Sequence, residues 1–229
     1  MTCLLLPFLV MADNFGELIF EDRFERTESQ EEKDEPGNEW TTSSDKTAEG
    51  NKQVDLRDGH LYIYTHKVAW HATSVRHAFA FTDGTIGLKL MFDNPEDSLT
   101  LNFTDLGEKS VHAGHLFNVS ISPKRVYFAD LKTGVMRQEI RKAKKENKLT
   151  PEQKKMLKTK SRSVPHALET GKWHQVYATV TGDVVSCSIN GKEIGSFESP
   201  GIAHDTKTLL RMLVAKNAHV DDVQIWRKK

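Results

Sequence analysis

The sequence has little cysteine, which excludes a disulfide-rich scaffold. Its 229 residues include two cysteines, Cys3 and Cys187. If an N-terminal leader carrying Cys3 is removed, no disulfide can form within the chain; a Cys3–Cys187 bridge is the alternative. The alternating segment 184–189 predicts that Cys187 is a structural thiol, since a reactive thiol needs cationic surroundings that the local sequence lacks.

Net charge is also lacking, because 32 Lys and Arg residues balance 32 Asp and Glu residues. This balance gives no reason to expect nucleic acid or an anionic membrane as a partner. Long apolar runs are absent after residue 12, so we predict no membrane span. The charges are nevertheless unevenly distributed: acidic residues crowd positions 21–35, and basic residues dominate positions 137–162.

The first twelve residues form an apolar run that ends in the small residue Ala12. This arrangement resembles the core and cleavage region of a secretory signal peptide, without the basic residues that normally precede it. We therefore predict that residues 1–12 are a truncated signal peptide and that the protein is secreted or periplasmic. The alternative is that the run is a buried first strand.

Helical periodicity is rare in the remainder, whereas short β-type runs separated by turn residues are frequent. The runs cover residues 18–20, 60–66, 78–81, 86–92, 99–103, 116–120, 125–129, 176–181, 184–189, 193–197, 208–214 and 223–226. Without helices between successive strands, a parallel α/β sheet is excluded. The pattern predicts a single all-β domain over residues 13–229, folded as an antiparallel β-sandwich.

Turn chemistry predicts two hairpins. Asn190-Gly191 suits a type I′ turn, which needs positive φ at both central residues, and Gly182-Asp183 precedes it at the right spacing. Residues 173–197 are therefore expected to form a three-stranded meander. The polar segment 26–51 is expected to be a mobile surface loop.

One short basic segment, about residues 135–162, is expected to be a helical insertion. Thr150, Pro151 and Gln153 have the spacing of a capping box with proline at the first helical position, which predicts two helices at an angle. The basic side chains have three interpretations: a solvated helix face, a binding surface for an anionic polysaccharide or nucleic acid, or a surface docked on the acidic residues 31–35. The solvated face is the default.

Two terminal signatures resemble a known family. Residues 18–24, followed by Glu39-Trp40, are similar to the opening strand of concanavalin A-like lectin/glucanase domains, and residues 220–226 are similar to their closing strand. Gly171-Lys172-Trp173-His174 and the Asn190-Gly191 hairpin also match. Within this superfamily the chain most resembles secreted planctomycete-type 3-keto-disaccharide hydrolase domains, which are family 16 glycoside hydrolase-like. The resemblance implies a concanavalin A-like jelly roll with carbohydrate as partner.

The sequence departs from ordinary family 16 glucanases at their catalytic strand. Those enzymes carry a Glu-x-Asp-x-(x)-Glu run, in which alternating carboxylates on one face supply the nucleophile and the general acid/base. No such run is present here. Ordinary retaining glucanase activity is therefore not expected.

The motif His112-Ala113-Gly114-His115 is the most suggestive candidate for chemistry. It follows the predicted strand that ends in Asp105 and precedes another at Leu116. Two imidazoles three residues apart can bind a metal or act as acid and base. The alternative is a pair of solvated loop histidines.

A second cluster contains His66, Trp70, His71 and His77, bracketed by Arg76 and followed by Asp83. We predict that His71 joins Asp105, His112 and His115 as acid/base or metal-site residues, and that the substrate-binding residues are His66, Trp70, Arg76, Asn102 and Lys132. Trp70 is the candidate aromatic platform for a sugar ring, whereas Trp40, Trp173 and Trp226 are expected in the core. Separate surface histidines and a solvated Lys132 are the alternatives.

The first and last strands lie close together in the resembling folds, where a calcium site often joins the termini. Asp22 and Asp222 are the candidate ligands here, because carboxylate oxygens suit calcium. A turn-capping Asp222 is the alternative.

Two functions lead, and a structural envelope or scaffold protein is the third possibility. The first is a carbohydrate-active hydrolase or lyase acting on (3-keto-)glycosides. The second is a non-catalytic carbohydrate-binding or cell-envelope recognition module.

Overall fold

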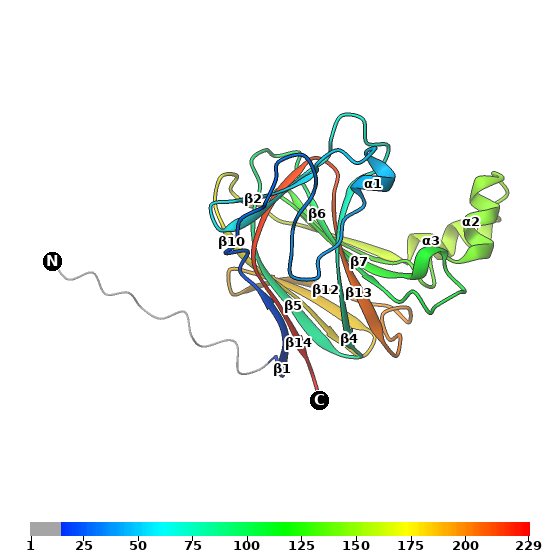
Figure 1. Cartoon of the computed structure of the whole chain (residues 1–229). Helices are drawn as coiled ribbons and strands as arrows, with labels where there is room; N and C mark the ends of the chain where they lie inside the picture. Colours follow the sequence, from blue (N-terminus) through cyan, green and yellow to red (C-terminus); the bar gives the residue numbers. More distant parts are fainter. Residues whose placement is uncertain (1–14) are drawn as a thin grey trace.

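The computed structural model describes residues 15–229, which fold into two antiparallel sheets packed face to face (Figure 1). The back sheet contains, in spatial order, β12 (Lys192–Glu198), β11 (Val184–Ile189), β10 (His174–Thr181), β5 (Gly84–Met91), β14 (Asn217–Arg227), β3 (His60–Tyr64) and β2 (Val54–Arg57), with β1 (Glu17–Asp22) also paired to β14. The front sheet contains β4 (Thr73–Phe81), β13 (Lys207–Val214), β6 (Leu99–Thr104), β7 (His115–Ser122), β8 (Arg125–Asp130) and β9 (Ser161–Pro165). The predicted all-β sandwich is confirmed.

The core lies between the sheets and is built by strand alternation. In the front sheet, Val75, Met212 and Leu101 occupy one row of neighbouring strands, and all are buried. Since successive side chains on a strand point to opposite faces, the next row stands on the outer face of this sheet. That outer row carries Arg76, Arg211 and Asn102, so ordinary β alternation assembles the polar site described below.

The predicted meander is present and its turn chemistry is as expected. Asn190 and Gly191 have φ values of 51° and 78° and join β11 to β12, while Gly182, at 57°, lies between β10 and β11. Cys187 is a buried free thiol on β11, and burial raises its pKa to about 12. This agrees with a structural role and excludes a thiolate nucleophile at neutral pH.

Two helices, α2 (Gln138–Lys145) and α3 (Pro151–Lys158), join β8 to β9 and stand beside the sandwich (Figure 1). Thr150 and Gln153 form the predicted capping box, with Pro151 at the start of α3. Ile140 is the buried residue of α2, and α3 has none. The insertion is therefore attached to the sandwich mainly through α2.

The segment 26–51 has more specific structure than the expected mobile loop. It contains the short helix α1 (Ser44–Thr47), and Lys52, which follows it, binds the carboxylates of Glu28 (2.7 Å), Glu31 (3.1 Å) and Asp55 (2.8 Å). Glu31 therefore pairs with Lys52, so this carboxylate does not serve to dock the basic helices.

The sequence-based expectation for one tryptophan was wrong. Trp40 and Trp226 are buried as predicted, but Trp173 is 40% exposed. Its ring lies beside the imidazoles of His60 and His219 on the back sheet, at centroid distances of 5.3 and 6.4 Å.

Two predictions fall outside the described residues, namely the signal peptide at residues 1–12 and the alternative bridge from Cys3. Among residues 15–229, no helix is both long enough and apolar enough to cross a membrane.

Candidate functional site

A row of polar side chains crosses the outer face of the front sheet. Strand register places Arg76 of β4 opposite Arg211 of β13, then Asn102 of β6 and Asn118 of β7. Because these positions are direct cross-strand neighbours, their side chains are adjacent on one face. We call Arg76, Arg211, Asn102, His112 and His115 the arginine–histidine cluster.

His115, at the start of β7, is connected to this row by hydrogen bonds. Its Nδ1 lies 2.7 Å from Oδ1 of Asn102, whose amide nitrogen donates to Asn118 Oδ1 at 2.7 Å. Since the Asn102 oxygen is thus the acceptor, His115 Nδ1 carries the proton in this network. Nη1 of Arg211 lies 3.2 Å from Nε2 and 3.4 Å from Nδ1 of His115, so the guanidinium contacts both ring nitrogens.

The surroundings of His115 keep its imidazole neutral. Burial lowers its pKa to about 4, and the positive charges of Arg211, His112, Arg141 and His71 contribute in the same direction. An imidazole with this pKa has its Nε2 lone pair available throughout the neutral range.

The turn that leads into His115 is shaped by two positive φ angles. Ala113 has φ 51° and Gly114 has φ 70°, and a Cβ at Gly114 would lie 2.1 Å from the carbonyl oxygen of Asp105. Glycine is therefore required at position 114. The turn directs the carbonyl of Ala113 to Arg211, whose Nη2 donates to it at 3.0 Å.

Helix α2 lies beside this turn because backbone hydrogen bonds join the two segments. The amide of His112 donates to Met136 O at 2.8 Å, and the amide of Gln138 donates to Ser110 O at 3.0 Å. Burial is the largest cause that lowers the pKa of His112, and the positive charge of Arg141 on the adjacent α2 lowers it further.

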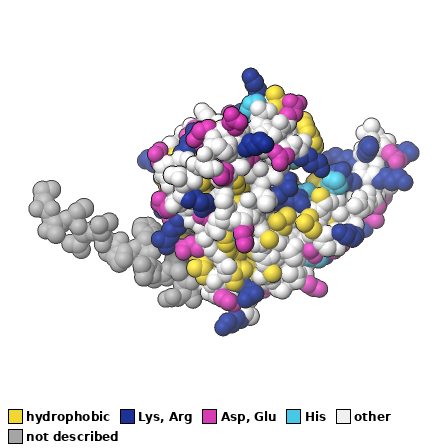
Figure 2. All heavy atoms as spheres, viewed as in Figure 1, with side chains coloured by type: hydrophobic (Ala, Val, Ile, Leu, Met, Phe, Trp, Pro, Cys, Tyr) yellow, Lys and Arg dark blue, Asp and Glu magenta, His cyan; other side chains and the backbone are white. Residues whose placement is uncertain are grey.

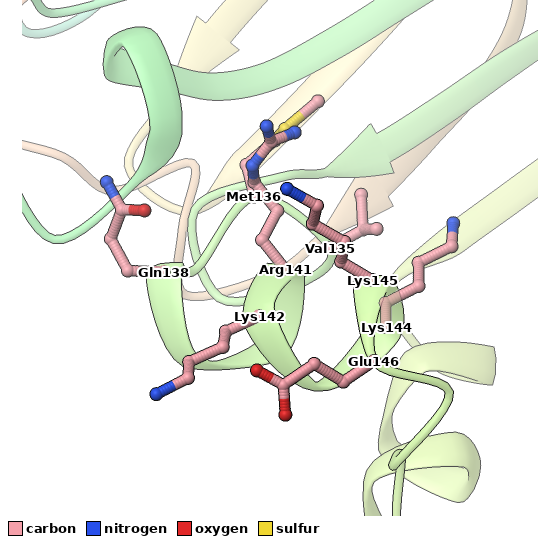
Figure 3. Close-up of a pocket in the computed structure, with 8 residues that line it drawn as sticks. All are labelled: Val135, Met136, Gln138, Arg141, Lys142, Lys144, Lys145 and Glu146. Atoms are coloured by element: carbon pink, nitrogen blue, oxygen red, sulfur yellow. The ribbon is translucent and has the colours of Figure 1, made fainter.

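A groove of about 830 Å³ follows α2. Figure 3 shows Arg141 and Lys145 projecting toward the side of Val135 and Met136, whereas Lys142 points away. Figure 2 shows Lys, Arg and His side chains gathered in the hollow between the helices and the sandwich. The basic insertion therefore extends the positive surface of the arginine–histidine cluster.

The six strands of the front sheet contain a single acidic residue, Asp130. Asp130 is buried and accepts hydrogen bonds from Thr133, Ser199 and Gly201. The strands of the front sheet therefore contain no pair of carboxylates of the kind that flanks the bond in most glycosidases.

Asp105, expected beside the histidines, turns its carboxylate elsewhere. Its Oδ2 accepts from His204 Nε2 at 2.9 Å, and Lys132 Nζ donates to His204 Nδ1 at 2.8 Å. Lys132 also lies 3.5 Å from Glu108. Burial alone would raise the pKa of Asp105, but hydrogen bonds from His204 and Gly107 lower it. Asp105 and Lys132 thus belong to a separate Asp–His–Lys–Glu network.

Two other predicted residues lie at the edge of the site. Trp70 is 68% exposed, and its ring meets that of His71 edge-on at 5.7 Å. The backbone of His66 joins the same loop, where its carbonyl accepts from Ala69. His71 contributes to the lowered pKa of His115, and Trp70 is the neighbour of His71 in the loop before β4.

Asp22 and Asp222, the predicted calcium ligands, have other partners. The Asp22 carboxylate accepts from Arg26 Nη1 (2.7 Å) and Trp40 Nε1 (2.8 Å), while Asp222 lies 2.5 Å from Lys89 Nζ. This set of N–H donors does not fit a calcium ion, which takes oxygen ligands. The calcium site stays a prediction that requires these donors to be displaced.

Comparisons with known proteins place the fold. No model of a protein family matches the sequence, and no curated protein is significantly similar to it. Solved structures do match. A non-specific endo-β-1,3(4)-glucanase of family GH16, SCLam, has a TM-score of 0.59 at 11% identity, covering 93% of this chain and 91% of that one. LamA from Z. galactanivorans, solved with laminaritriose and laminaritetraose, has a TM-score of 0.55 at 12% identity, covering 93% and 99%.

The chain has the concanavalin A-like fold. A carbohydrate-binding module of Bacillus subtilis, CBM66, is similar over 81% of this chain and 93% of its own, with a TM-score of 0.52 at 8% identity. The concanavalin A-like sandwich is thus shared with glucanases and with a binding module. Fold alone does not choose between these functions.

Sequence reasoning missed Arg211 and His204. Both lie more than ninety residues from their partners His115 and Asp105, so no local motif joins them. One signal was available: Arg211 interrupts the apolar run 209–214 at an outward position of a predicted strand.

Proposed function

We propose that the protein is carbohydrate-active and takes its saccharide on the outer face of the front sheet, at the arginine–histidine cluster. The observation that carries this proposal is the contact between the His115 imidazole and Arg211, on a face rich in amide and hydroxyl groups. Side chains of this kind hydrogen-bond sugar hydroxyls, and Trp70 at the rim offers a ring for stacking. The shared fold with glucanases and a carbohydrate-binding module supports the proposal.

The reaction that suits this site is hydrolysis or elimination of a 3-keto-glycoside. A 3-keto group acidifies the proton on C2, so a base can remove it while a cation stabilises the enolate oxygen. When the enolate carbonyl re-forms, the C1–O bond breaks and the aglycone leaves, taking a proton from water; addition of water to the elimination product completes a hydrolysis. His115 Nε2 is the base in this proposal, and Arg211 stabilises the enolate oxygen. The low pKa of His115 keeps Nε2 unprotonated at neutral pH. In this proposal Arg211 turns from the imidazole to the enolate oxygen, and negative charge developing beside His115 raises its proton affinity as the reaction proceeds.

Only part of the predicted catalytic set lies together: the three histidines are neighbours, and the carboxylate of Asp105 is not among them. His112 and His115 lie 6.3 Å apart by ring centroids, and His71 is near enough to affect the pKa of His115. Asp105 acts on the other side of the turn, where it orients His204. In this proposal Asp105 holds the backbone that carries the motif, since its amide donates to Gly114 O at 2.9 Å.

A turnover assay on 3-keto-glucosides tests the proposal, with release of the aglycone as the readout. His115→Gln is expected to lower kcat by at least about 100-fold, the usual contribution of a general base. His166→Gln is the matched control, because His166 lies outside the site and bonds to Lys124 O through its backbone. Equal activity of the His115 variant and the wild type would contradict the assignment.

The second candidate function is a non-catalytic binding module. It is favoured by the absence of Asp and Glu from the outer face of the front-sheet strands among residues 15–229. Saccharide binding that is lost in His115→Gln, without turnover of any keto-glycoside by the wild type, would establish this function instead.

A further inference from the structure

Arg76 and Arg211 form a pair of like charges without a counter-charge. They are directly opposite on β4 and β13, and neither is fully exposed. Their hydrogen bonds go to neutral groups: Arg76 Nε donates to Ser74 Oγ at 3.0 Å, and Arg211 donates to Ala113 O and His115. The Nε of Arg211 is buried and has no partner.

No ion pair within residues 15–229 involves Arg76, Arg211 or Arg141. Arg26 differs from these arginines, because both of its terminal nitrogens donate hydrogen bonds to the carboxylate of Asp22. The arginines of the front-sheet face are therefore left unneutralised by the protein itself.

Such an arrangement costs free energy in the free protein. Like charges directly opposite on neighbouring strands repel one another, and partial burial removes part of the water that would screen them. Burial and the charge of Arg76 together lower the pKa of Arg211 to about 10. An anion placed between the two guanidinium groups removes this cost, since each group presents a planar fork that matches a carboxylate or a sulfate.

We propose that the saccharide ligand is acidic and that Arg76 and Arg211 together bind its anionic group, a carboxylate or a sulfate ester. This inference rests on the proposed function, because it names the class of saccharide that the same face accepts. Arg141 adds positive charge at one side of the pair. Lys145 projects to the same side as Arg141, along the groove beside α2 (Figure 3). The positive surface therefore extends from the two arginines along α2, which suits a saccharide chain with repeated negative charges.

The geometry also explains why the site holds a neutral imidazole. Without a ligand, burial and, after it, the charges of Arg211 and its neighbours His112, Arg141 and His71 disfavour a positive charge at His115. A bound carboxylate or sulfate supplies negative charge at the same place, so the pKa of His115 rises on binding. The groups that face His115 are Arg211 of β13, His112 of the preceding turn, Arg141 of α2 and His71 before β4.

Calorimetric titration with three oligosaccharides of equal length tests the inference: an oligogalacturonate, a sulfated galactan oligosaccharide and a neutral β-glucan oligosaccharide. Inorganic sulfate is the fourth titrant. The acidic sugar that the site accepts is expected to bind at least about 10-fold more tightly than the neutral one. The affinities of the uronate and the sulfate ester, compared with each other, decide which anion the two guanidinium groups prefer.

Three variants make the titration specific. Arg76→Gln and Arg211→Gln are each expected to remove the preference for the acidic sugar, while Arg76→Lys restores only part of it, since an ammonium lacks the fork. Arg125→Gln is the control, because Arg125 lies on the outer face of the same sheet but packs over Tyr127, outside the cluster. Thermal melting of each variant verifies that it is folded.

The outcomes separate this inference from the proposed function. If neutral and acidic sugars bind equally, and the arginine variants bind like the wild type, the acidic-ligand inference is overturned while the saccharide site stands. If inorganic sulfate binds but no oligosaccharide does, both the saccharide site and the inference fail. A preference for acidic sugar that persists in both glutamine variants also overturns the inference.

Discussion

Arg76 and Arg211 face each other across the β4–β13 strand pair, and within residues 15–229 neither guanidinium forms an ion pair with a carboxylate. Because this repulsion is present only in the folded protein, Arg76→Gln should stabilise the unliganded fold by about 0.5 kcal/mol. For a chain of this size the melting temperature rises by roughly 1–2 °C. Differential scanning calorimetry in chloride buffer measures the change.

Arg125→Gln provides the control for that prediction, since it removes an exposed arginine from the same sheet face. Its melting temperature should match that of the wild type. If Arg76→Gln melts below the wild type, by more than the control does, then Arg76 stabilises the fold and its repulsion with Arg211 is not the larger effect.

The low pKa of His115 gives a second prediction. The folded protein binds this proton only near pH 4, whereas an unfolded histidine binds it near pH 6.5. The unfolded state therefore holds more protons between these values, so stability is lost as pH falls through this window and is constant above it. The full effect is on the order of 3 kcal/mol.

Chemical denaturation of the wild type and His115→Gln across pH 4 to 7 isolates this contribution, because the other buried histidines are common to both proteins. The wild type should show the steeper decline toward pH 4. Parallel stability curves for the two proteins would refute the assignment of a depressed pKa to His115.

The turn at Gly114 gives a third prediction, with a built-in control. Gly182→Ala places a Cβ in open space at φ 57°, so its cost is that of the left-handed conformation, about 1 kcal/mol. Gly114→Ala has a similar φ but also brings its Cβ against Asp105 O, so the loss is larger, roughly 2–4 kcal/mol. Urea denaturation compares the two. Equal losses would show that the close approach at Asp105 does not constrain the turn.

Trp70 tests the aromatic platform. Trp70→Ala is expected to weaken saccharide binding about 10-fold, since stacking on an exposed ring contributes roughly 1 kcal/mol or more. Stability should change little, because the side chain is 68% exposed. Trp173→Ala, on the back sheet, is the matched control and should bind normally. The reverse result would move the sugar site to the back sheet.

Chelation tests the calcium prediction at Asp22 and Asp222. The Asp22 carboxylate is already held by Arg26 and Trp40, so EDTA should leave the melting temperature unchanged. A fall of several degrees that added calcium reverses would establish a metal site despite these contacts.

The sandwich was largely predictable because its signals are local. Strand alternation, the Asn190-Gly191 turn and the capping box at Thr150 each depend on residues a few positions apart. Strands β2 and β9 were missed because residues 54–57 and 161–165 are short and polar at the edges of their sheets, where little burial imposes a pattern.

The site was predictable only in part, for a reason of topology. Asn102 and His115 lie on consecutive strands, and the prediction already grouped them with Arg76. Arg211 joins them only because β13 inserts between β4 and β6, an order that a single sequence does not reveal. The same holds for His204, whose contact with Asp105 diverted that carboxylate from the predicted cluster.

The histidine resonances provide the most direct test of the central claim that saccharide binds the outer face of the front sheet. Heteronuclear NMR of histidine side chains during titration with the oligosaccharides should shift His115 and His112, while His60 and His219 of the back sheet remain unchanged. Shifts confined to His60 and His219, beside the exposed Trp173, would contradict the account.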